Sequence, residues 1–175
     1  MTYKWYKNAS NLRQIFWIEG TDVAYAYLED DITLDDNLTI QGDKDAGAKT
    51  LYLCLNGHTL NLGEYMIWVG NRGGTLYLCD CSTDQTGTVS GGSNRCVSVS
   101  DAFNYASTFN MYGGTLKGGH KTHGGGVEIN NGTMNLYGGT IEENTATSDG
   151  GIGQHSVYGC SRQGILCRRG TVGGE

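Results

Sequence analysis

Apolar and polar residues alternate in several short stretches of this chain, and one of these stretches occurs twice. The string TLYLC stands at residues 50–54 and again at residues 75–79, 25 positions apart. Related strings begin at Thr108 (TFNMYGGTLKGG) and at Thr133 (TMNLYGGTIEEN), again 25 positions apart. A period of about 20 to 50 residues is typical of repeat proteins, in which each unit buries its apolar face against its neighbours. The pattern therefore predicts four visible copies of one structural unit.

Alignment of the four copies shows a period of two residues, which is the period of a β-strand. One apolar column contains Leu51, Leu76, Phe109 and Met134, and a second contains Leu53, Leu78, Met111 and Leu136. The column between them contains Tyr52, Tyr77, Asn110 and Asn135. We expect the apolar columns to line a core and the intervening side chains to face outward.

Two further short strands are predicted in each copy. The second centres on Leu60, Val89, Leu116 and Ile141, and the third covers residues 67–69, 97–99 and 127–129, with a weaker equivalent at Ile152. Three strands and three turns in about 25 residues describe one coil of a parallel β-helix, whose equivalent strands stack about 4.8 Å apart. An α-solenoid is the alternative for such a repeat, but the glycines after each strand and the period of two argue against helices.

The predicted fold is therefore all-β, a right-handed parallel β-helix with about 25 residues per coil and roughly five coils. The step from Thr75 to Thr108 is 33 residues, so we expect an insertion of eight residues around the string STDQTG. We expect an N-terminal cap over residues 1–22, the β-helix over residues 23–154 and an irregular tail over residues 155–175.

The first coil and its cap are less regular than the later copies. Strands are predicted at residues 23–28, 32–34 and 38–40, and the preceding string ASNLRQIFWIEG fits a short capping helix or an edge strand. A cap is needed because the end of an open stack exposes unpaired backbone groups and an apolar cross-section.

Three strings resemble the right-handed β-helix repeats of bacterial surface and adhesin-like proteins: LCLNGHTL, FNMYGGTLKGG and GGGVEINNGTMNLYGGTIEENTA. The resemblance covers about residues 51–153. Those proteins share the fold of the pectate-lyase superfamily, so the resemblance implies a β-helix. Function has to be argued from a site, because one fold serves many functions.

Composition agrees with a turn-rich β-fold. Glycine supplies 29 of the 175 residues and proline none, which differs from a proline-rich linker. No apolar run approaches the roughly 18 residues that would cross a bilayer, so we expect no membrane insertion. The first 14 residues also lack the apolar centre of a secretory signal. We expect a cytoplasmic protein if the chain is complete, and a secreted or surface protein if it is a fragment.

Acidic residues concentrate near the N-terminus of this chain, whose net charge is −6. Nine acids fall within residues 19–45, where Lys44 is the one base. This segment, with Asp30, Asp31, Asp35 and Asp36 at its centre, has three interpretations: a solvated cap, a calcium site, or a surface that docks on a basic nucleic-acid-binding protein. No basic stripe exists to neutralise phosphates, so direct nucleic-acid binding is not expected.

The residues that could carry catalysis or bind a metal do not form a recognisable set. Glycosidases need two carboxylates at a fixed separation, yet the acids of the regular coils do not recur in one column, and only Glu128 is expected in the middle of a strand. His58 is interpreted as a turn side chain, and His120 and His123 as part of a solvated glycine-rich loop. No catalytic residue and no cofactor other than a calcium ion is expected.

The cysteines likewise lack the spacing of a zinc site. Cys79 and Cys81 form C-x-C, and the second pair that a zinc site needs is absent. The repeat register makes Cys54 and Cys79 vertical neighbours, which we expect to be a ladder of reduced thiols.

Three functional hypotheses follow. The first is a non-catalytic binding or structural β-helix, such as an adhesin-like fragment, that presents Tyr52, Tyr77, Asn110 and Asn135 to a protein or glycan. The second is a small intracellular inhibitor, such as a phage-encoded one, whose acidic surface blocks a nucleic-acid-binding enzyme. The third is a carbohydrate-active polysaccharide lyase or hydrolase.

Overall fold

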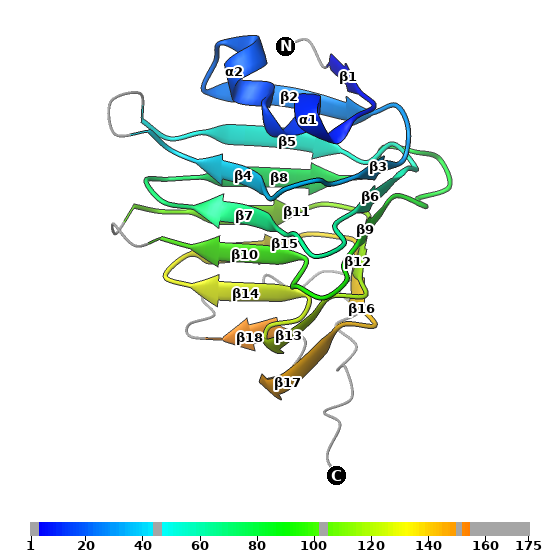
Figure 1. Ribbon diagram of the computed structural model, residues 1–175, viewed down its shortest axis with the longest axis vertical. Helices are drawn as coiled ribbons and strands as arrows, with labels where there is room; N and C mark the ends of the chain where they lie inside the picture. Colours follow the sequence, from blue (N-terminus) through cyan, green and yellow to red (C-terminus); the bar gives the residue numbers. More distant parts are fainter. Residues whose placement is uncertain (1–3, 44–46, 102–104, 150–151, 155–175) are drawn as a thin grey trace.

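The chain forms a right-handed parallel β-helix of about four turns. The computed structural model describes residues 4–43, 47–101, 105–149 and 152–154 (Figure 1). Each pass of the chain adds one strand to each of three parallel sheets, which we name A, B and C. The described residues include no helix that is long and apolar enough to cross a membrane.

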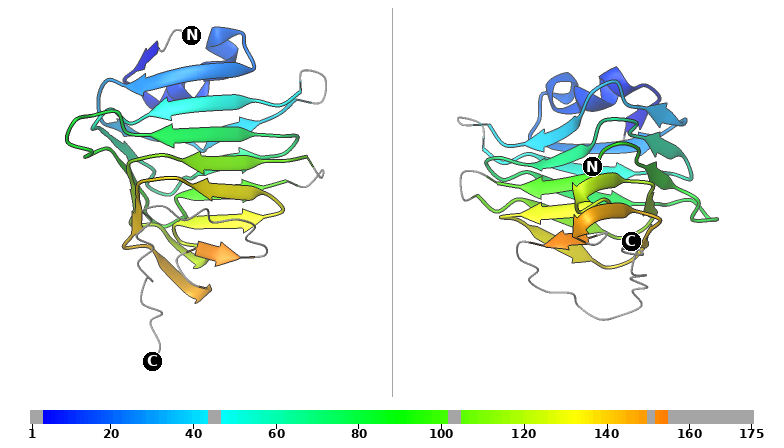
Figure 2. Two further views of the ribbon diagram at one scale, coloured as in Figure 1. Left: turned by 180° about the vertical axis from the view of Figure 1, so that it is seen from behind. Right: turned by 60° about the horizontal axis from the view of Figure 1, so that its bottom comes forward.

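The three sheets run along the length of the β-helix, and a short fourth sheet joins them at the C-terminal end. Sheet A, which lies toward the viewer in the left panel of Figure 2, contains β1 (Lys4–Tyr6), β2 (Val23–Leu28), β5 (Thr50–Cys54), β8 (Thr75–Cys79), β11 (Thr108–Met111) and β15 (Thr133–Leu136). Sheet B contains β3 (Ile32–Thr33), β6 (Thr59–Asn61), β9 (Thr88–Ser90), β12 (Thr115–Lys117) and β16 (Thr140–Glu142). Sheet C contains β4 (Leu38–Gln41), β7 (Ile67–Gly70), β10 (Val97–Ser100), β14 (Val127–Asn130) and β18 (Ile152–Gln154). The fourth sheet pairs β13 (His120–His123) with β17 (Thr145–Asp149).

The register predicted from the repeated strings is confirmed. Residue 51 pairs with residue 76, 76 with 109 and 109 with 134, and every strand pair is parallel. Leu53 and Leu78 are fully buried, and Met111 and Leu136 continue their column through the interior. Burial of one such side chain stabilises the fold by about 1.5–3 kcal/mol. The core is therefore a set of continuous apolar columns along the axis.

The eight extra residues between Thr75 and Thr108 do not form the single insertion that the sequence predicted. Residues 80–87 join β8 to β9 where residues 55–58 make the same connection one coil earlier, and residues 101–107 join β10 to β11 where residues 71–74 do so. The extra length is therefore shared among the corners, because a loop grows at a corner without disturbing the stacked strands.

The N-terminal cap is helical over the string ASNLRQIFWIEG, the first of the two predicted alternatives, and an edge strand precedes that string. Two short helices, α1 (Ala9–Arg13) and α2 (Ile15–Glu19), follow the edge strand β1, which pairs with β2. The Asn8 side chain caps α1 by accepting a hydrogen bond from the Asn11 backbone at 2.9 Å. Leu12 and Ile15 are fully buried, so the helices close the apolar end of the core. The predicted tail of residues 155–175 lies outside the described residues.

Candidate functional site

A stripe of stacked aromatic rings runs along the outer face of sheet A. It consists of Tyr25, Tyr52, Tyr77, Tyr112 and Tyr137, which we call the tyrosine stripe. Successive ring centroids lie 4.7, 4.4, 6.4 and 4.6 Å apart. The stack follows from the register, because in-register parallel strands place like side chains directly above one another.

The stripe changes column where asparagine replaces tyrosine. Asn110 pairs with Tyr77 in the register, and Asn135 pairs with Asn110, as the repeat alignment predicted. The Asn135 side-chain nitrogen donates a hydrogen bond of 2.9 Å to the Asn110 side-chain oxygen. The stripe therefore steps from Tyr77 to Tyr112 in the next outward column, which accounts for the longer centroid distance of 6.4 Å. The sequence prediction considered this column only for Cys54 and Cys79 and so missed the tyrosines that continue it.

The outer face of sheet A carries aromatic, hydroxyl and amide groups but no charge along β5, β8, β11 and β15. The strings TLYLC, TLYLC, TFNM and TMNL contain no acidic or basic residue, and a threonine opens each of them. Tyr112 and Tyr137 are 52% and 49% exposed, and Tyr52 and Tyr77 are half-buried. Because the rings stack face to face, Tyr25, Tyr52 and Tyr77, the upper tyrosines of the stripe, present ring edges and phenol oxygens to solvent.

The acidic segment faces solvent, and the carboxylates of Asp31, Asp35 and Asp36 are engaged within the molecule. Asp30, Asp31, Asp35 and Asp36 are all exposed. Arg13 of α1 donates a hydrogen bond to Asp35 at 2.7 Å and lies 3.9 Å from Asp36. This hydrogen bond holds the pKa of the Asp35 carboxyl below its usual value.

Other cations of the cap and of the β5 edge also face this segment. Lys7 pairs with Glu29 at 3.3 Å, Lys49 pairs with Asp22, and Lys4 with Glu19. The sequence interpretation counted only Lys44, which lies outside the described residues. The missed bases lie outside residues 19–45, in β1, in α1 and in the segments beside β1 and β5, and the fold brings them next to the acids.

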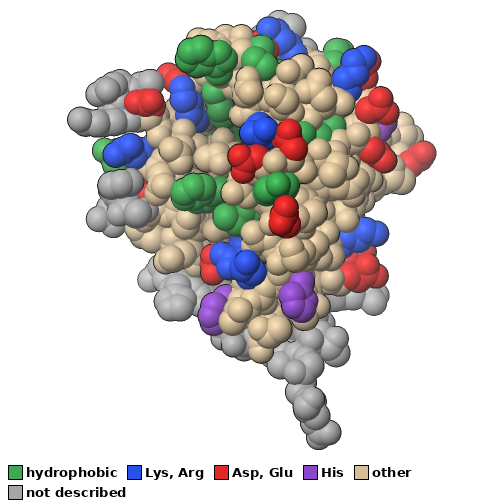
Figure 3. All heavy atoms as spheres, in the orientation of Figure 1, with side chains coloured by type: hydrophobic (Ala, Val, Ile, Leu, Met, Phe, Trp, Pro, Cys, Tyr) green, Lys and Arg blue, Asp and Glu red, His purple; other side chains and the backbone are tan. Residues whose placement is uncertain are grey.

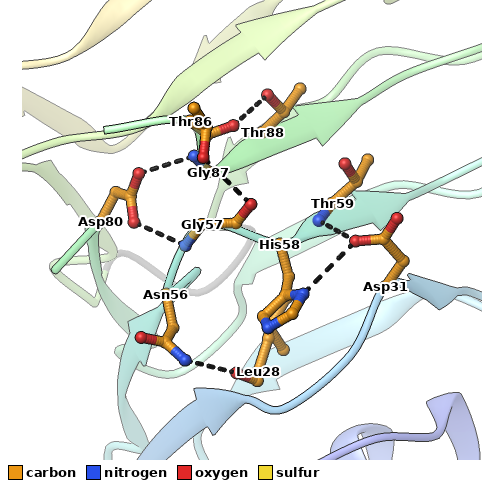
Figure 4. Close-up of polar contacts among 10 residues, drawn as sticks. All are labelled: Leu28, Asp31, Asn56, Gly57, His58, Thr59, Asp80, Thr86, Gly87 and Thr88. Carbon is orange, nitrogen blue, oxygen red and sulfur yellow. Dashed lines mark hydrogen bonds and ion pairs between the residues drawn. The ribbon is translucent and has the colours of Figure 1, made fainter. Parts of the chain in front are cut away.

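Asp31 links the first coil to the second at the corner between sheets A and B. Its carboxylate accepts a hydrogen bond from the Thr59 backbone at 2.7 Å and lies 3.6 Å from Nδ1 of His58 (Figure 4). His58 follows an Asn56–Gly57 turn in which both residues have positive φ, +53° and +81°. That conformation favours asparagine and glycine, so it explains the NG of the string LNGHTL. His58 is therefore a turn residue, as predicted, with an acidic neighbour that the sequence did not indicate.

Asp80 is a buried acid that anchors the long loop of residues 80–87. Its two oxygens accept hydrogen bonds from the backbone of Gly57 at 2.9 Å and of Gly87 at 2.6 Å (Figure 4). The backbone and hydroxyl of Ser82 add two more, at 3.1 and 3.0 Å. Burial by itself raises the pKa of Asp80, but these hydrogen bonds to the ionised form outweigh burial and lower it. The loop is thereby fixed against the coil above.

The cysteines form a cluster at the strand ends of sheet A. Cys54 and Cys79 are register partners, as predicted, but Cys54 is joined to Cys81 by a disulfide, so the expected ladder of reduced thiols is wrong. Cys79 is a half-buried free thiol, and burial followed by the Asp80 charge raises its pKa. The loop anchored by Asp80 folds Cys81 back onto Cys54. The prediction missed this disulfide because it considered only equivalent strand positions, and Cys81 lies in the loop.

The remaining predicted residues lie away from the tyrosine stripe. His120 and His123 belong to β13 and are exposed, so the predicted glycine-rich loop is wrong at these positions. Glu128, in the middle of β14 as expected, forms an ion pair with Arg95. Figure 3 shows acidic and basic side chains interspersed over this face of the molecule, which carries sheet C. The strands of sheet C are themselves nearly free of charge, because β4, β7 and β10 contain no acidic or basic residue and β14 contains only Glu128.

Comparison of the sequence with protein-family models and with curated proteins, and a search of solved structures, gave no match. The function therefore has to be argued from the geometry alone.

Proposed function

We propose that this protein is a non-catalytic binding protein whose outer sheet A face engages a neutral polysaccharide along the tyrosine stripe. The observation that carries the proposal is the combination of stacked tyrosines, an asparagine ladder and threonine hydroxyls on a face on which β5, β8, β11 and β15 carry no charge. Uncharged donors and acceptors beside aromatic surface complement sugar rings, which present hydroxyl groups at their rims and C–H groups on their faces.

The exposure of the rings indicates where a sugar would pack. Tyr52 and Tyr77 use their faces against each other, at an interplanar angle of 5°, so they offer ring edges and hydroxyl groups. Tyr112 and Tyr137 are about half exposed and provide the largest aromatic area of the stripe. We therefore place the main contact at Tyr112 and Tyr137, with the upper tyrosines and Asn135 along the same path.

The length of the stripe favours an extended chain over a single sugar. Five rungs separated by about 4.8 Å span about 19 Å along the axis. Each rung repeats similar groups, so a polymer with a regular repeat gains several equivalent contacts at once. A folded protein surface would match such a regular linear array less readily.

The hypothesis of an acidic docking surface for a basic protein receives less support. Asp31, Asp35 and Asp36 are engaged with Thr59 and Arg13 inside the molecule. A basic partner would have to replace these contacts, which reduces the net gain of binding.

Affinity electrophoresis on gels containing polysaccharide tests the proposal. The panel contains neutral β-glucans and mannans and, as a charged comparison, polygalacturonate. We expect retardation by at least one neutral polymer and a loss of about tenfold or more in affinity for Tyr112→Ala/Tyr137→Ala, because exposed aromatic anchors dominate such interfaces. Tyr105→Ala removes a tyrosine that is 54% exposed in the corner before β11 and should change nothing. Retention only by the charged polymer, or equal loss in both variants, would contradict the proposal.

A further inference from the structure

Three cysteine sulfurs converge where β5 and β8 end. The Sγ atoms of Cys54, Cys79 and Cys81 all lie within 4.8 Å of one another. Cys54 is buried, Cys79 half-buried and Cys81 exposed. The cluster is thus closed on the side of the core and open on the side of solvent.

Two independent parts of the fold hold this arrangement. Cys54 and Cys79 occupy the same column of adjacent parallel strands. Cys81 is held by its loop, in which Asp80 accepts backbone hydrogen bonds from Gly57 and Gly87. Gln85 secures the same loop by donating to the carbonyl oxygens of Asp80 and Ser82 at 2.8 and 2.7 Å. These contacts do not involve sulfur, so the three cysteines stay together when the disulfide is open.

We propose that the reduced cluster is a binding site for one soft metal ion of the Zn²⁺ or Cu⁺ class, held by three thiolates. Thiolate sulfur selects ions of this class over the oxygen-preferring Mg²⁺ and Ca²⁺. At a metal–sulfur distance of about 2.3 Å, three sulfurs around one ion lie about 4 Å apart. The three Sγ atoms already lie within 4.8 Å of one another, so metal binding needs only a slight approach of Cys79 and the opening of the Cys54–Cys81 bond.

The disulfide makes metal binding dependent on reduction. A dithiol reductant transfers two electrons to the Cys54–Cys81 bond, which breaks to give two cysteine thiols while the dithiol closes to its own disulfide. The three cysteine thiols then release three protons as three metal–sulfur bonds form. In the oxidised protein two of the three ligands are consumed, so the site is closed.

The fourth coordination position of such an ion is left to solvent or to a partner. Asp80 is the neighbouring carboxylate, but both of its oxygens are occupied by hydrogen bonds from the backbone and from Ser82. The exposed position of Cys81 provides the path by which an ion enters. A three-sulfur site with one open position is typical of ions that exchange or react, in contrast to closed four-ligand structural sites.

The test uses the full chain with its other three cysteines replaced by serine, as C96S/C160S/C167S, so that only the cluster binds. After reduction with a phosphine, the chain is titrated without oxygen with Cd²⁺, a soft probe whose thiolate complexes absorb in the ultraviolet, and then with Zn²⁺ in competition. We expect saturation at one ion per chain. The additional change Cys79→Ser should weaken binding by about tenfold or more, since the loss of a residue that only hydrogen-bonds to a metal ligand already lowers metal affinity by this much.

Two further arms keep the result decisive. The oxidised chain, with its disulfide intact, should take up no Cd²⁺ at the same concentrations, and reduction should restore uptake. Circular dichroism shows whether Cys79→Ser is folded. If it is not, the comparison of Cd²⁺ uptake by the oxidised and the reduced parent tests the proposal by itself. Failure of the reduced chain to bind, binding that survives unchanged in folded Cys79→Ser, or equal binding by the oxidised chain would overturn the proposal.

Discussion

The side-chain nitrogen of Asn135 donates a hydrogen bond of 2.9 Å to the side-chain oxygen of Asn110, its register partner one coil away. Asn110 is buried although it points out of sheet A, because the stripe steps past it to Tyr112. The amide pair therefore fills the place that a tyrosine would occupy in the central column, and it joins two coils.

Replacement of Asn110 tests this role. Asn110→Ala removes the acceptor for Asn135, and we expect the free energy of unfolding to fall by about 1–2 kcal/mol. Urea denaturation measures the change. Asn130→Ala, at an exposed asparagine that ends β14, is the matched control and should stay within about 0.5 kcal/mol of the parent. Equal stability of the two variants would show that the amide pair contributes nothing.

Asp80 should be the acid on which the fold depends most. In Asp80→Asn one acceptor oxygen becomes a donor that faces backbone N–H groups, so we expect a loss of about 2–3 kcal/mol. Asp84→Asn changes an exposed acid of the same loop and should be nearly neutral. Thermal unfolding of both variants measures the difference. A neutral effect at Asp80 would contradict the anchoring of residues 80–87.

The disulfide should stabilise the fold by restricting the unfolded chain. It joins cysteines 27 positions apart, for which loop closure accounts for about 3–4 kcal/mol. A reductant should therefore lower the melting temperature of the parent and leave Cys81→Ser unaffected. Thiol counting before and after reduction checks that the bond was present. A parent protein that melts at the same temperature with and without reductant would refute this contribution.

The register itself can be tested through the core. Leu78 is fully buried in an interior column, between Leu53 of the coil before and Met111 of the coil after. Leu78→Asp should unfold the chain, because it places an unpaired charge among apolar side chains, whereas Leu78→Ala should cost about 2–5 kcal/mol. Circular dichroism and urea denaturation measure the two outcomes. A folded Leu78→Asp of parental stability would exclude the proposed interior column.

The repeated strings were sufficient to predict the sheets, because stacking like residues on like residues is both the sequence period and the structural contact. The column of Tyr52, Tyr77, Asn110 and Asn135 was predicted correctly for the same reason. The pairing of Cys54 with Cys81 was not, since Cys81 stands in a loop that is longer than its counterpart, residues 55–58, in the coil before.

The electrostatics of the acidic segment also escaped prediction. Arg13 meets Asp35 only because α1 folds over the end of the first coil, 22 residues away in sequence. Repeat periodicity describes contacts between equivalent positions, and it contains no information on contacts made by a cap or an irregular loop. The contacts between equivalent strand positions were therefore predicted, and the contacts made by the cap and by the irregular loop were missed.

The most direct test of the binding proposal is chemical-shift mapping of the isotopically labelled protein with the neutral oligosaccharide that binds most tightly in the panel. The account predicts shifts that follow the outer face of sheet A, largest around Tyr112, Tyr137 and Asn135, with little change at Trp68 and Glu128 on sheet C. Shifts confined to sheet C or to the acidic segment, or none at saturating ligand, would contradict it.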